Sequence, residues 1–547
     1  MTRYSPQLLS DHTPLIPDSA ELRATTKGHG LYNSFQFVLR LSPEVHRKLS
    51  GVPEGISTSG MDFEAIQAFS TYLHETIHWW QHVGSTFGLI LSMTYPTQAH
   101  SNYDLLRRLT DQVGFKKSIR QLAETLPSGG FGTPAGIANT IINNHFDMEV
   151  FRGLTVTPLT VEKALRHPQF ESHAHSFHIT WASGLSLLSS VSDRAFSVIP
   201  HPKEWEPEFE KLREAKVEGY YYGSPVTLCP LGAYELFEGQ ARMAQLQYLH
   251  FGTGGRFEMK DAVALEMFEG VYGEAFSAFL TMTGLSWPNS IDHPTVALFL
   301  LACDVAINPG SGFPFPLVNF QTFVWDADPG TRFMLMCKQA RSECPEVFSL
   351  IIGYTRAEYE EASTKLCSTI REIPPLAIAA EFDRWSATPE FAPLMEQYRA
   401  YAFDSSNLVP RMLFSHFLAF MRDKYRRPEF FCWPGPWMAG KRVSTEAVDL
   451  FERHGALFVD KEHDDGVFPR LIKGRDERDL HKAFEEFYAH NTVFNLTRQW
   501  ITTPGPFTYN FRWLSQTESP RVIQDYCDRV FASVYDVRPG DAELLNS

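Results

Sequence analysis

A single long helical pattern near the start of the chain constrains its fold more than any other feature. Asp62 is a suitable helix N-cap, and apolar residues follow it with the spacing of one helix face. These apolar positions are Phe63, Ile66, Phe69, Leu73, Ile77 and Trp80. His74 and His78 lie four residues apart within the pattern, and residues four apart share a face of a helix. The sequence therefore predicts a helix that presents two imidazoles to one point in space.

The two histidines enclose the sequence His74-Glu75-Thr76-Ile77-His78, which matches the H-E-x-x-H pattern of zinc hydrolases. Zinc binds imidazole nitrogen at about 2.0–2.1 Å, a reach that one helical turn satisfies. With a strand-like segment before it, this helix resembles the active-site helix of the zincin superfamily of metallopeptidases. The resemblance implies that His74 and His78 bind Zn2+ and that Glu75 is the general base for a metal-activated water. The alternative is a pair of structural histidines.

A zinc site needs a third protein ligand. The metzincin pattern would place Gly three residues and His six residues after His78, but Gln81 and Gly84 occupy these positions. His82 is also unsuitable, because an unbroken helix rises about 12 Å between His74 and His82. We expect His82 to support a neighbouring group or to lie on the helix surface. Gln81 is placed to orient a ligand or the substrate.

The third ligand is instead expected on a second helix. The segment Glu238-Gly239-Gln240-Ala241 resembles the Glu-Gly-x-Ala turn that supplies the glutamate ligand in aminopeptidase-N-like gluzincins. Gly and Ala beside the ligand would let two helices approach closely, and Gly inside a helix otherwise costs up to about 1 kcal/mol relative to Ala. The resemblance implies Glu238 as the third ligand, across a gap of about 160 residues that requires a large insertion. Glu235, one turn away, is the alternative.

Three other groups of residues are open to a functional interpretation. Two contain histidines and could hold a second metal ion, although no spacing in them matches an established metal site. The third is a run of tyrosines that could supply a hydroxyl to stabilise an oxyanion. For all three, a structural role is the simpler expectation. The groups are His145, Asp147 and Glu149; His167, His173, His175 and His178; and Tyr220, Tyr221 and Tyr222.

Two other functional hypotheses stay open. Glu75 and His78 also form a Glu-x-x-His element of the type that binds iron in carboxylate-bridged di-iron proteins, but no second such element lies in a comparably good helix. The other is a non-enzymatic interaction protein with a zincin-like core, against which the intact His74, Glu75 and His78 argue. No G-x-S-x-G element, P-loop or Rossmann glycine pattern is evident, so neither serine-based nor nucleotide-driven chemistry is indicated.

Composition argues against several classes of protein. The formal net charge of −15 repels phosphate backbones and anionic membranes, and the densest basic cluster, residues 422–427, is interrupted by Asp423. The longest apolar run, residues 296–303, is too short to span a bilayer, and the N-terminus shows no apolar signal segment. Seven scattered cysteines without C-x-x-C spacing fit a reducing compartment. We therefore expect a cytoplasmic protein that binds no nucleic acid and no membrane.

The sequence predicts a mainly helical α+β protein, with a zincin-like catalytic region at residues 1–325 and a large, mostly helical accessory region at residues 326–547. Residues 34–41 alternate as a half-buried strand. Helices are expected at residues 103–126, 136–152, 181–196, 231–249, 258–283, 294–307, 356–372, 391–424 and 477–491. The predicted function is a zinc-dependent metallopeptidase that hydrolyses peptide or amide bonds of a protein or peptide substrate. One Zn2+ would be bound by His74, His78 and Glu238.

Overall fold

The computed structural model describes residues 29–50, 61–511, 514–515 and 517–545. Of these residues, 64% are helical and 5% lie in strands, which confirms the prediction of a mainly helical protein. The likeness of its core to the zincins stays a prediction. Within the described ranges, no helix is both long enough and apolar enough to cross a membrane.

The predicted helix after Asp62 is present as α3 (Phe63–Val83) and is buried along most of its length. The Asp62 carboxylate accepts a hydrogen bond from the N–H of Ala65 at 2.7 Å, as expected of an N-cap. Gly84 follows the last residue of the helix, and its N–H donates to the main-chain oxygen of Trp80 at 2.6 Å. Both ends of this helix therefore lie where capping residues place them.

The next helix differs from the prediction, which placed it at residues 103–126. It is α4 (Thr86–Val113), and it starts much earlier because the Ser85 side chain accepts a hydrogen bond from the N–H of Gly88 at 2.9 Å. It ends at Gly114, which has a φ of 82°. The two-residue strand β3 (Lys116–Lys117) then separates it from α5 (Ile119–Thr125).

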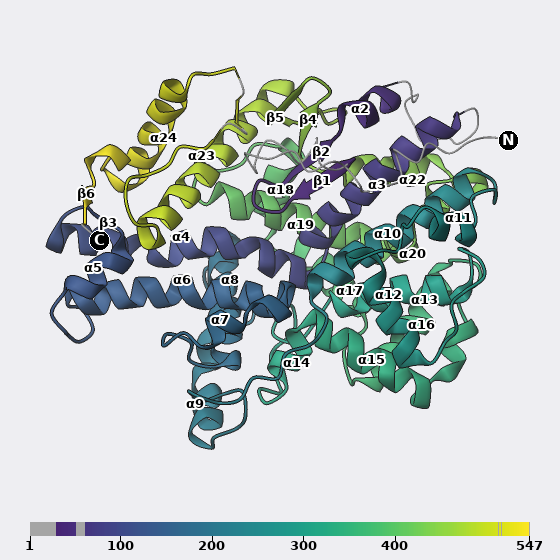
Figure 1. Ribbon diagram of the computed structural model, residues 1–547, viewed down its shortest axis with the longest axis horizontal. Helices are drawn as coiled ribbons and strands as arrows, with labels where there is room; N and C mark the ends of the chain where they lie inside the picture. The colour runs from purple at the N-terminus through teal and green to yellow at the C-terminus, as the bar shows by residue number, and fades with distance from the viewer. Residues whose placement is uncertain (1–28, 51–60, 512–513, 516, 546–547) are drawn as a thin grey trace.

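A four-stranded sheet lies beside α3 (Figure 1). Its strands, in the order β1-β2-β4-β5, are β1 (Gly30–Asn33), β2 (Val38–Leu41), β4 (Phe458–Lys461) and β5 (Asp464–Pro469). The strand predicted at residues 34–41 is confirmed only over its second half. The chain turns before that half, because the Asn33 side chain accepts hydrogen bonds from the N–H groups of Phe35 (3.1 Å) and Gln36 (2.8 Å). β2 is antiparallel to β1 and parallel to β4.

The helices around α3 form the body of the molecule. α10 (Ala233–Gly252) packs along α3, and α12 (Val271–Thr283) packs against α10. α4 packs against α6 (Pro134–Val156), which also contacts α8 (His173–Ser192). In Figure 1, α4 and α6 run side by side toward the left, while α10 to α13, α15 and α16 gather at the right.

Elements that follow residue 326 pack directly on those that precede it. α19 (Leu408–Arg426) contacts α3, α4 and α8, and α23 (Glu477–Thr502) contacts α4, α5 and α6. The pairing of β4 with β2 joins the two predicted regions in one sheet, and their buried apolar residues form one cluster. The division at residue 325 stays a prediction, but the two regions share a sheet and a core.

The remaining helices and strands surround this arrangement. They are α2 (Pro43–Leu49), α7 (Glu162–Leu165), α9 (Glu206–Glu214), α11 (Met259–Ala264), α13 (Pro294–Ala306), α14 (Phe323–Ala327), α15 (Pro329–Glu343), α16 (Arg356–Thr369), α17 (Pro375–Ser386), α18 (Ala392–Ala400), α20 (Pro428–Cys432), α21 (Pro434–Trp437), α22 (Thr445–Arg453), α24 (Pro520–Tyr535) and β6 (Glu543–Leu544). β6 pairs with β3, so the end of the described chain lies beside the start of α5 (Figure 1).

Candidate metal centre

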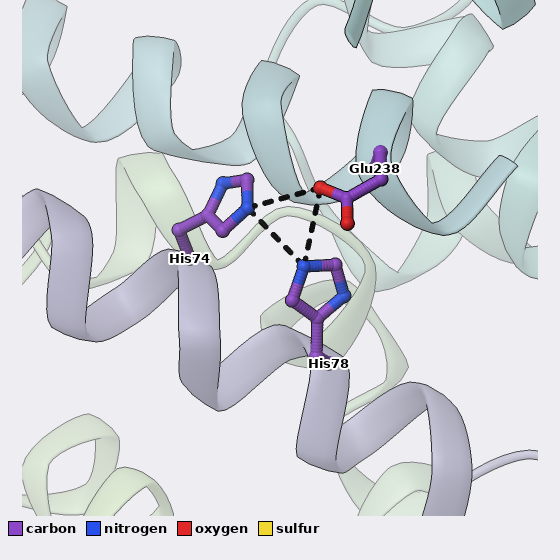
Figure 2. Close-up of side chains that lie close together, drawn as sticks. All are labelled: His74, His78 and Glu238. Carbon is purple, nitrogen blue, oxygen red and sulfur yellow. Dashed lines mark hydrogen bonds and ion pairs between the residues drawn. The ribbon is translucent and has the colours of Figure 1, made fainter. Parts of the chain in front are cut away.

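The structure brings His74, His78 and Glu238 together at one point (Figure 2). Both histidines project from α3, and Glu238 reaches them from α10. Nε2 of His74 and Nε2 of His78 are 3.2 Å apart, and each lies 3.4 Å from Oε2 of Glu238. In the described parts of the chain, this is the one group of His, Cys, Asp and Glu side chains with three ligand atoms close enough to hold one ion.

These separations fit a tetrahedral zinc ion. Bonds of about 2.0–2.1 Å at tetrahedral angles place neighbouring ligand atoms about 3.3–3.4 Å apart. Two imidazoles and one carboxylate are also the donor set of catalytic zinc sites that keep a fourth position for water or substrate. The side chains present therefore have the spacing and the donor atoms that zinc requires.

Gln81 holds His78 in the orientation that metal binding needs. Its Oε1 accepts a hydrogen bond from Nδ1 of His78 at 2.8 Å, which leaves Nε2 as the atom that would bind a metal ion after losing its proton. Its Nε2 donates to the main-chain oxygen of Phe237 and to Oε1 of Gln240, both at 2.9 Å. One amide thus joins the helix that carries both histidines to the helix that carries Glu238.

Burial makes the charges of the three side chains interact strongly. The side chains of His74, His78 and Glu238 are 7%, 9% and 17% exposed. Burial lowers the pKa of His74 to about 4, so its ring is neutral near pH 7. Burial acts the same way on His78, but the Glu238 carboxylate outweighs it and raises the pKa of His78 to about 9. Although burial raises the pKa of Glu238, the two histidines hold it well below its usual range, so Glu238 is ionised as a metal ligand must be.

Glu75 lines the same cavity as the three ligand residues and is 6% exposed. Its side chain lies against the main chain of Gly30 in β1. A Cβ atom on Gly30 would lie 2.6 Å from both Cγ and Oε1 of Glu75, so any larger residue at this position would have to displace the Glu75 side chain. The expected general base is therefore enclosed by α3 on one side and by β1 on the other.

The glycine after Glu238 has a different role from the predicted one. A Cβ atom on Gly239 would lie 3.3 Å from Cβ of Ala275 in α12 and from a ring carbon of Phe299 in α13. Gly239 thus allows α10 to pack closely on α12 and α13, whereas we expected it to bring the two ligand helices together. The hydrogen bond between Gln81 and Gln240 makes that connection instead.

Glu235 and the tyrosine run lie outside the metal centre. Oε2 of Glu235 accepts a hydrogen bond from the N–H of Gly232 at 2.7 Å, which caps α10. The buried Tyr220 hydroxyl donates to the main-chain oxygens of Phe320 (2.7 Å) and Gln321 (3.0 Å). Glu235 and Tyr220 therefore have structural roles, and Tyr221 and Tyr222 do not line the cavity around the metal centre.

The other histidine clusters do not converge on one ion. Nε2 of His175 lies 3.3 Å from Oδ2 of Asp147 and 3.5 Å from Oε2 of Glu171. The ring of His178 stacks on Phe209 with a centroid distance of 4.4 Å. These contacts connect α6, α8 and α9, and no set of three ligand atoms meets there in the described residues.

A cavity of about 590 Å³ surrounds the metal centre, walled by β1, α3, α4, α6, α10 and α12. His82 lines it, with Nδ1 donating to the main-chain oxygen of His78 at 2.9 Å. The cavity also contains residues that the sequence did not single out, because they come from distant segments without a recognisable spacing. These include Gly30, Tyr95, Arg152, Tyr234 and Tyr272.

Comparison with known proteins assigns nothing further to this site. No protein-family model, curated protein or solved structure matches the chain. The candidate metal centre is therefore interpreted from its own geometry.

Proposed function

We propose that the protein is a zinc-dependent metallopeptidase that binds one Zn2+ through His74, His78 and Glu238. The observation that carries the proposal is the set of separations of 3.2–3.4 Å between three buried ligand atoms from two helices. These separations are close to the spacing of about 3.3–3.4 Å between ligand atoms of a tetrahedral zinc ion, and the two distances to the carboxylate are longer than most hydrogen bonds of imidazole to carboxylate, at about 2.7–3.2 Å. A cavity of about 590 Å³ beside these atoms leaves room for a substrate.

The side chains around this point support hydrolysis by a metal-activated water. A zinc ion held there would lower the pKa of a water ligand and polarise a substrate carbonyl. Glu75 is the general base: it takes the proton of the attacking water and returns it to the leaving amine. Tyr234 and Tyr272 line the same cavity, and a tyrosine hydroxyl there would stabilise the oxygen that gains charge in the reaction.

The strand beside the cavity favours a peptide as the substrate. β1 pairs with β2 and, within the described sheet, is an edge strand. Gly30, Leu31 and Tyr32 of this strand line the cavity. An edge strand offers main-chain N–H and C=O groups to an extended peptide, which supports peptide bonds as the target.

Metal analysis of the purified full-length protein and three variants tests the proposal. We expect about one zinc per chain in the wild type and in Glu75→Gln, and loss of the metal in His74→Ala and Glu238→Ala. Hydrolysis of a quenched fluorescent peptide library should fall by at least about 100-fold in all three variants. Glu235→Gln is the matched control, because Glu235 caps α10 one turn from Glu238 and should affect neither readout.

Other outcomes would support the rival hypotheses. Two irons per chain would indicate a di-iron protein. If Glu75→Gln keeps the biological function of the wild type, the protein is an interaction protein. If zinc is bound but no peptide is hydrolysed, the proposed peptidase function is rejected.

A further inference from the structure

The cavity extends from the metal centre along α3 and α4, with β1 on one side and α6 on the other. β1 starts beside Glu75. The ring of Tyr32 lies 5.1 Å from that of His82, and Phe35, just after β1, lies 4.7 Å from Tyr95 of α4. An extended peptide pairs residue by residue with a strand, so the four residues of β1, Gly30–Asn33, match about four residues of a bound peptide.

Tyr95 marks one end of the cavity. It also lines a neighbouring void of only about 10 Å³, together with Phe35, His145 and Arg498 among others. A peptide that lies along β1 from the metal centre must therefore end near Tyr95 or leave the cavity there.

Arg152 of α6 presents unused hydrogen-bond donors at this end of the cavity. Its side chain is 13% exposed and lines the cavity. The guanidinium lies 4.2 Å over the ring of Tyr95, Nη1 donates to Oγ1 of Thr94 at 2.8 Å, and Nη2 pairs with Glu149. A guanidinium has five N–H donors, so three of them have no acceptor among the described residues. The group is held rigidly but is not saturated.

The charges at this end favour an anion. Oε1 of Glu149 forms an ion pair with Arg152, and Nε of Arg498 lies 3.7 Å from the same oxygen. Although burial raises the pKa of Glu149, Arg152 and other neighbours lower it overall, so the carboxyl group is ionised. Burial lowers the pKa of His145 to about 4, which leaves that ring neutral near pH 7. Arg152, Glu149 and Arg498 together carry one net positive charge, although Arg498 is half exposed and lies outside the cavity lining.

We propose that Arg152 binds a carboxylate of the substrate and that the protein therefore acts on peptides with a free C-terminus about four residues from the cleaved bond. A planar carboxylate matches the paired donors of a guanidinium. An Asp or Glu side chain at the same distance offers the same chemistry. This inference rests on the proposed peptidase function and names the substrate class of the same site.

Peptides that differ only at their last group test this inference. N-acetylated peptides of Ala, Leu and Phe, about four to eight residues long, are made as free acids, as C-terminal amides, and as amides that end in Glu. We expect the zinc-loaded wild type to prefer free acids over amides by at least about 10-fold in kcat/KM, mainly through KM. If kcat/KM recovers in the amides that end in Glu, the site also recognises a carboxylate side chain. If it does not recover, the site recognises the C-terminal carboxylate alone. Both results support a carboxylate site.

Two variants of one ion pair separate a binding role from a structural one. Arg152→Met should abolish the preference for free acids, whereas Glu149→Gln should increase it by removing the competing carboxylate. A purely structural pair predicts the same direction of change in both, which would overturn the proposal. Arg166→Met is the control, because the Arg166 side chain follows α7 directly, is 78% exposed and lies outside the cavity.

Peptide binding measured without turnover distinguishes a loss of recognition from a loss of folding or of catalysis. Binding of acid and amide peptides to the zinc-loaded Glu75→Gln protein, measured by calorimetry, should show the same preference. Adding Arg152→Lys, which keeps the charge but loses the paired donors, should reduce this preference without abolishing it. Equal binding and cleavage of acids and amides would reject the carboxylate site while leaving the peptidase intact. Failure to bind or cleave any peptide would reject both.

Discussion

Gly30 controls the position of the expected general base, although it carries no functional group. A Cβ atom there would lie 2.6 Å from Cγ and Oε1 of Glu75. Gly30→Ala should therefore displace the carboxyl group while leaving the three ligand residues in place. Since a misplacement of about 1 Å can cost 100-fold in rate, we expect peptide hydrolysis to fall by about 10- to 100-fold. Initial rates and zinc content, measured on the same preparation, check this prediction.

A second glycine provides the control for that substitution. A Cβ atom on Gly130 would meet nothing within 4 Å, so Gly130→Ala should change neither the rate nor the zinc content. Wild-type activity in Gly30→Ala would mean that β1 does not hold Glu75 in position.

The sequence identified the candidate residues that have a fixed spacing along a helix or lie in a short segment that resembles a known motif. His74, Glu75 and His78 share one helix, so their relative positions follow from helix geometry alone. Glu238 was predicted from a short segment that resembles a known turn. Gly30 and Arg152 reach the cavity only through tertiary packing, for which one sequence offers no spacing to read.

Between elements, Gln81 connects α3 to α10 beside the ligands. It accepts from Nδ1 of His78 and donates to Phe237 and Gln240. Gln81→Met would leave His78 free to rotate and change tautomer, so we expect zinc affinity to fall by about 10- to 100-fold. Competition with a chelator of known affinity measures this change.

The control for Gln81 is another amide that links the same two helices farther from the ligands. Nε2 of Gln245 donates to Oγ of Ser70 at 3.2 Å, so Gln245→Met also removes a bond between α10 and α3. It should lower stability with little change in zinc affinity. Equal losses of zinc affinity in both variants would mean that helix packing, and not the orientation of His78, sets the affinity.

The start of α15 gives a pH dependence of stability with a defined sign. Asp328 caps this helix by accepting from the N–H of Thr331 at 2.8 Å, and burial raises its pKa to about 6. An unfolded Asp has a pKa of about 3.9. The folded state therefore holds the proton more tightly, and stability falls as pH rises from about 4 to about 6, by up to about 3 kcal/mol.

Asp328→Asn tests this sign, because Asn keeps an N-cap acceptor but has no charge. We expect a higher urea midpoint than that of the wild type above pH 6, and a difference that disappears toward pH 4. Asp476→Asn, at the exposed N-cap of α23, is the control and should not raise the midpoint. A midpoint in Asp328→Asn that is lower than wild type at pH 8 would contradict the prediction.

Elements were predicted well where capping residues mark both ends, and poorly where one side chain redirects the chain. Asp62 and Gly84 delimit α3, and the sequence placed the start of this helix correctly. The Asn33 side chain turns the chain between β1 and β2, and Ser85 starts α4 long before its predicted start. The alternation of residues 34–41 and the pattern after residue 103 contain no signal for either event.

In the whole molecule, the sheet beside the metal centre is built from both ends of the chain. β1 and β2 precede α3, whereas β4 and β5 come from beyond residue 457. The Asp460 side chain of β4 accepts from the N–H of Leu41 (3.1 Å) and from Nε2 of His46 (2.7 Å), and it is fully buried. The two regions therefore share buried hydrogen bonds as well as apolar contacts, which predicts that they unfold together.

Calorimetric unfolding distinguishes this prediction from two independent domains. Asp460→Ala leaves a buried N–H and an imidazole without their acceptor, at a cost of about 2–4 kcal/mol. Zinc binds only residues that precede 325 in the proposed site, and it should stabilise the folded state in proportion to its occupancy. If the molecule is one cooperative unit, both changes move a single transition, down with Asp460→Ala and up with zinc. If residues 1–325 and 326–547 are separate, two transitions appear, zinc moves one of them, and the buried contacts across β2 and β4 contribute little to stability.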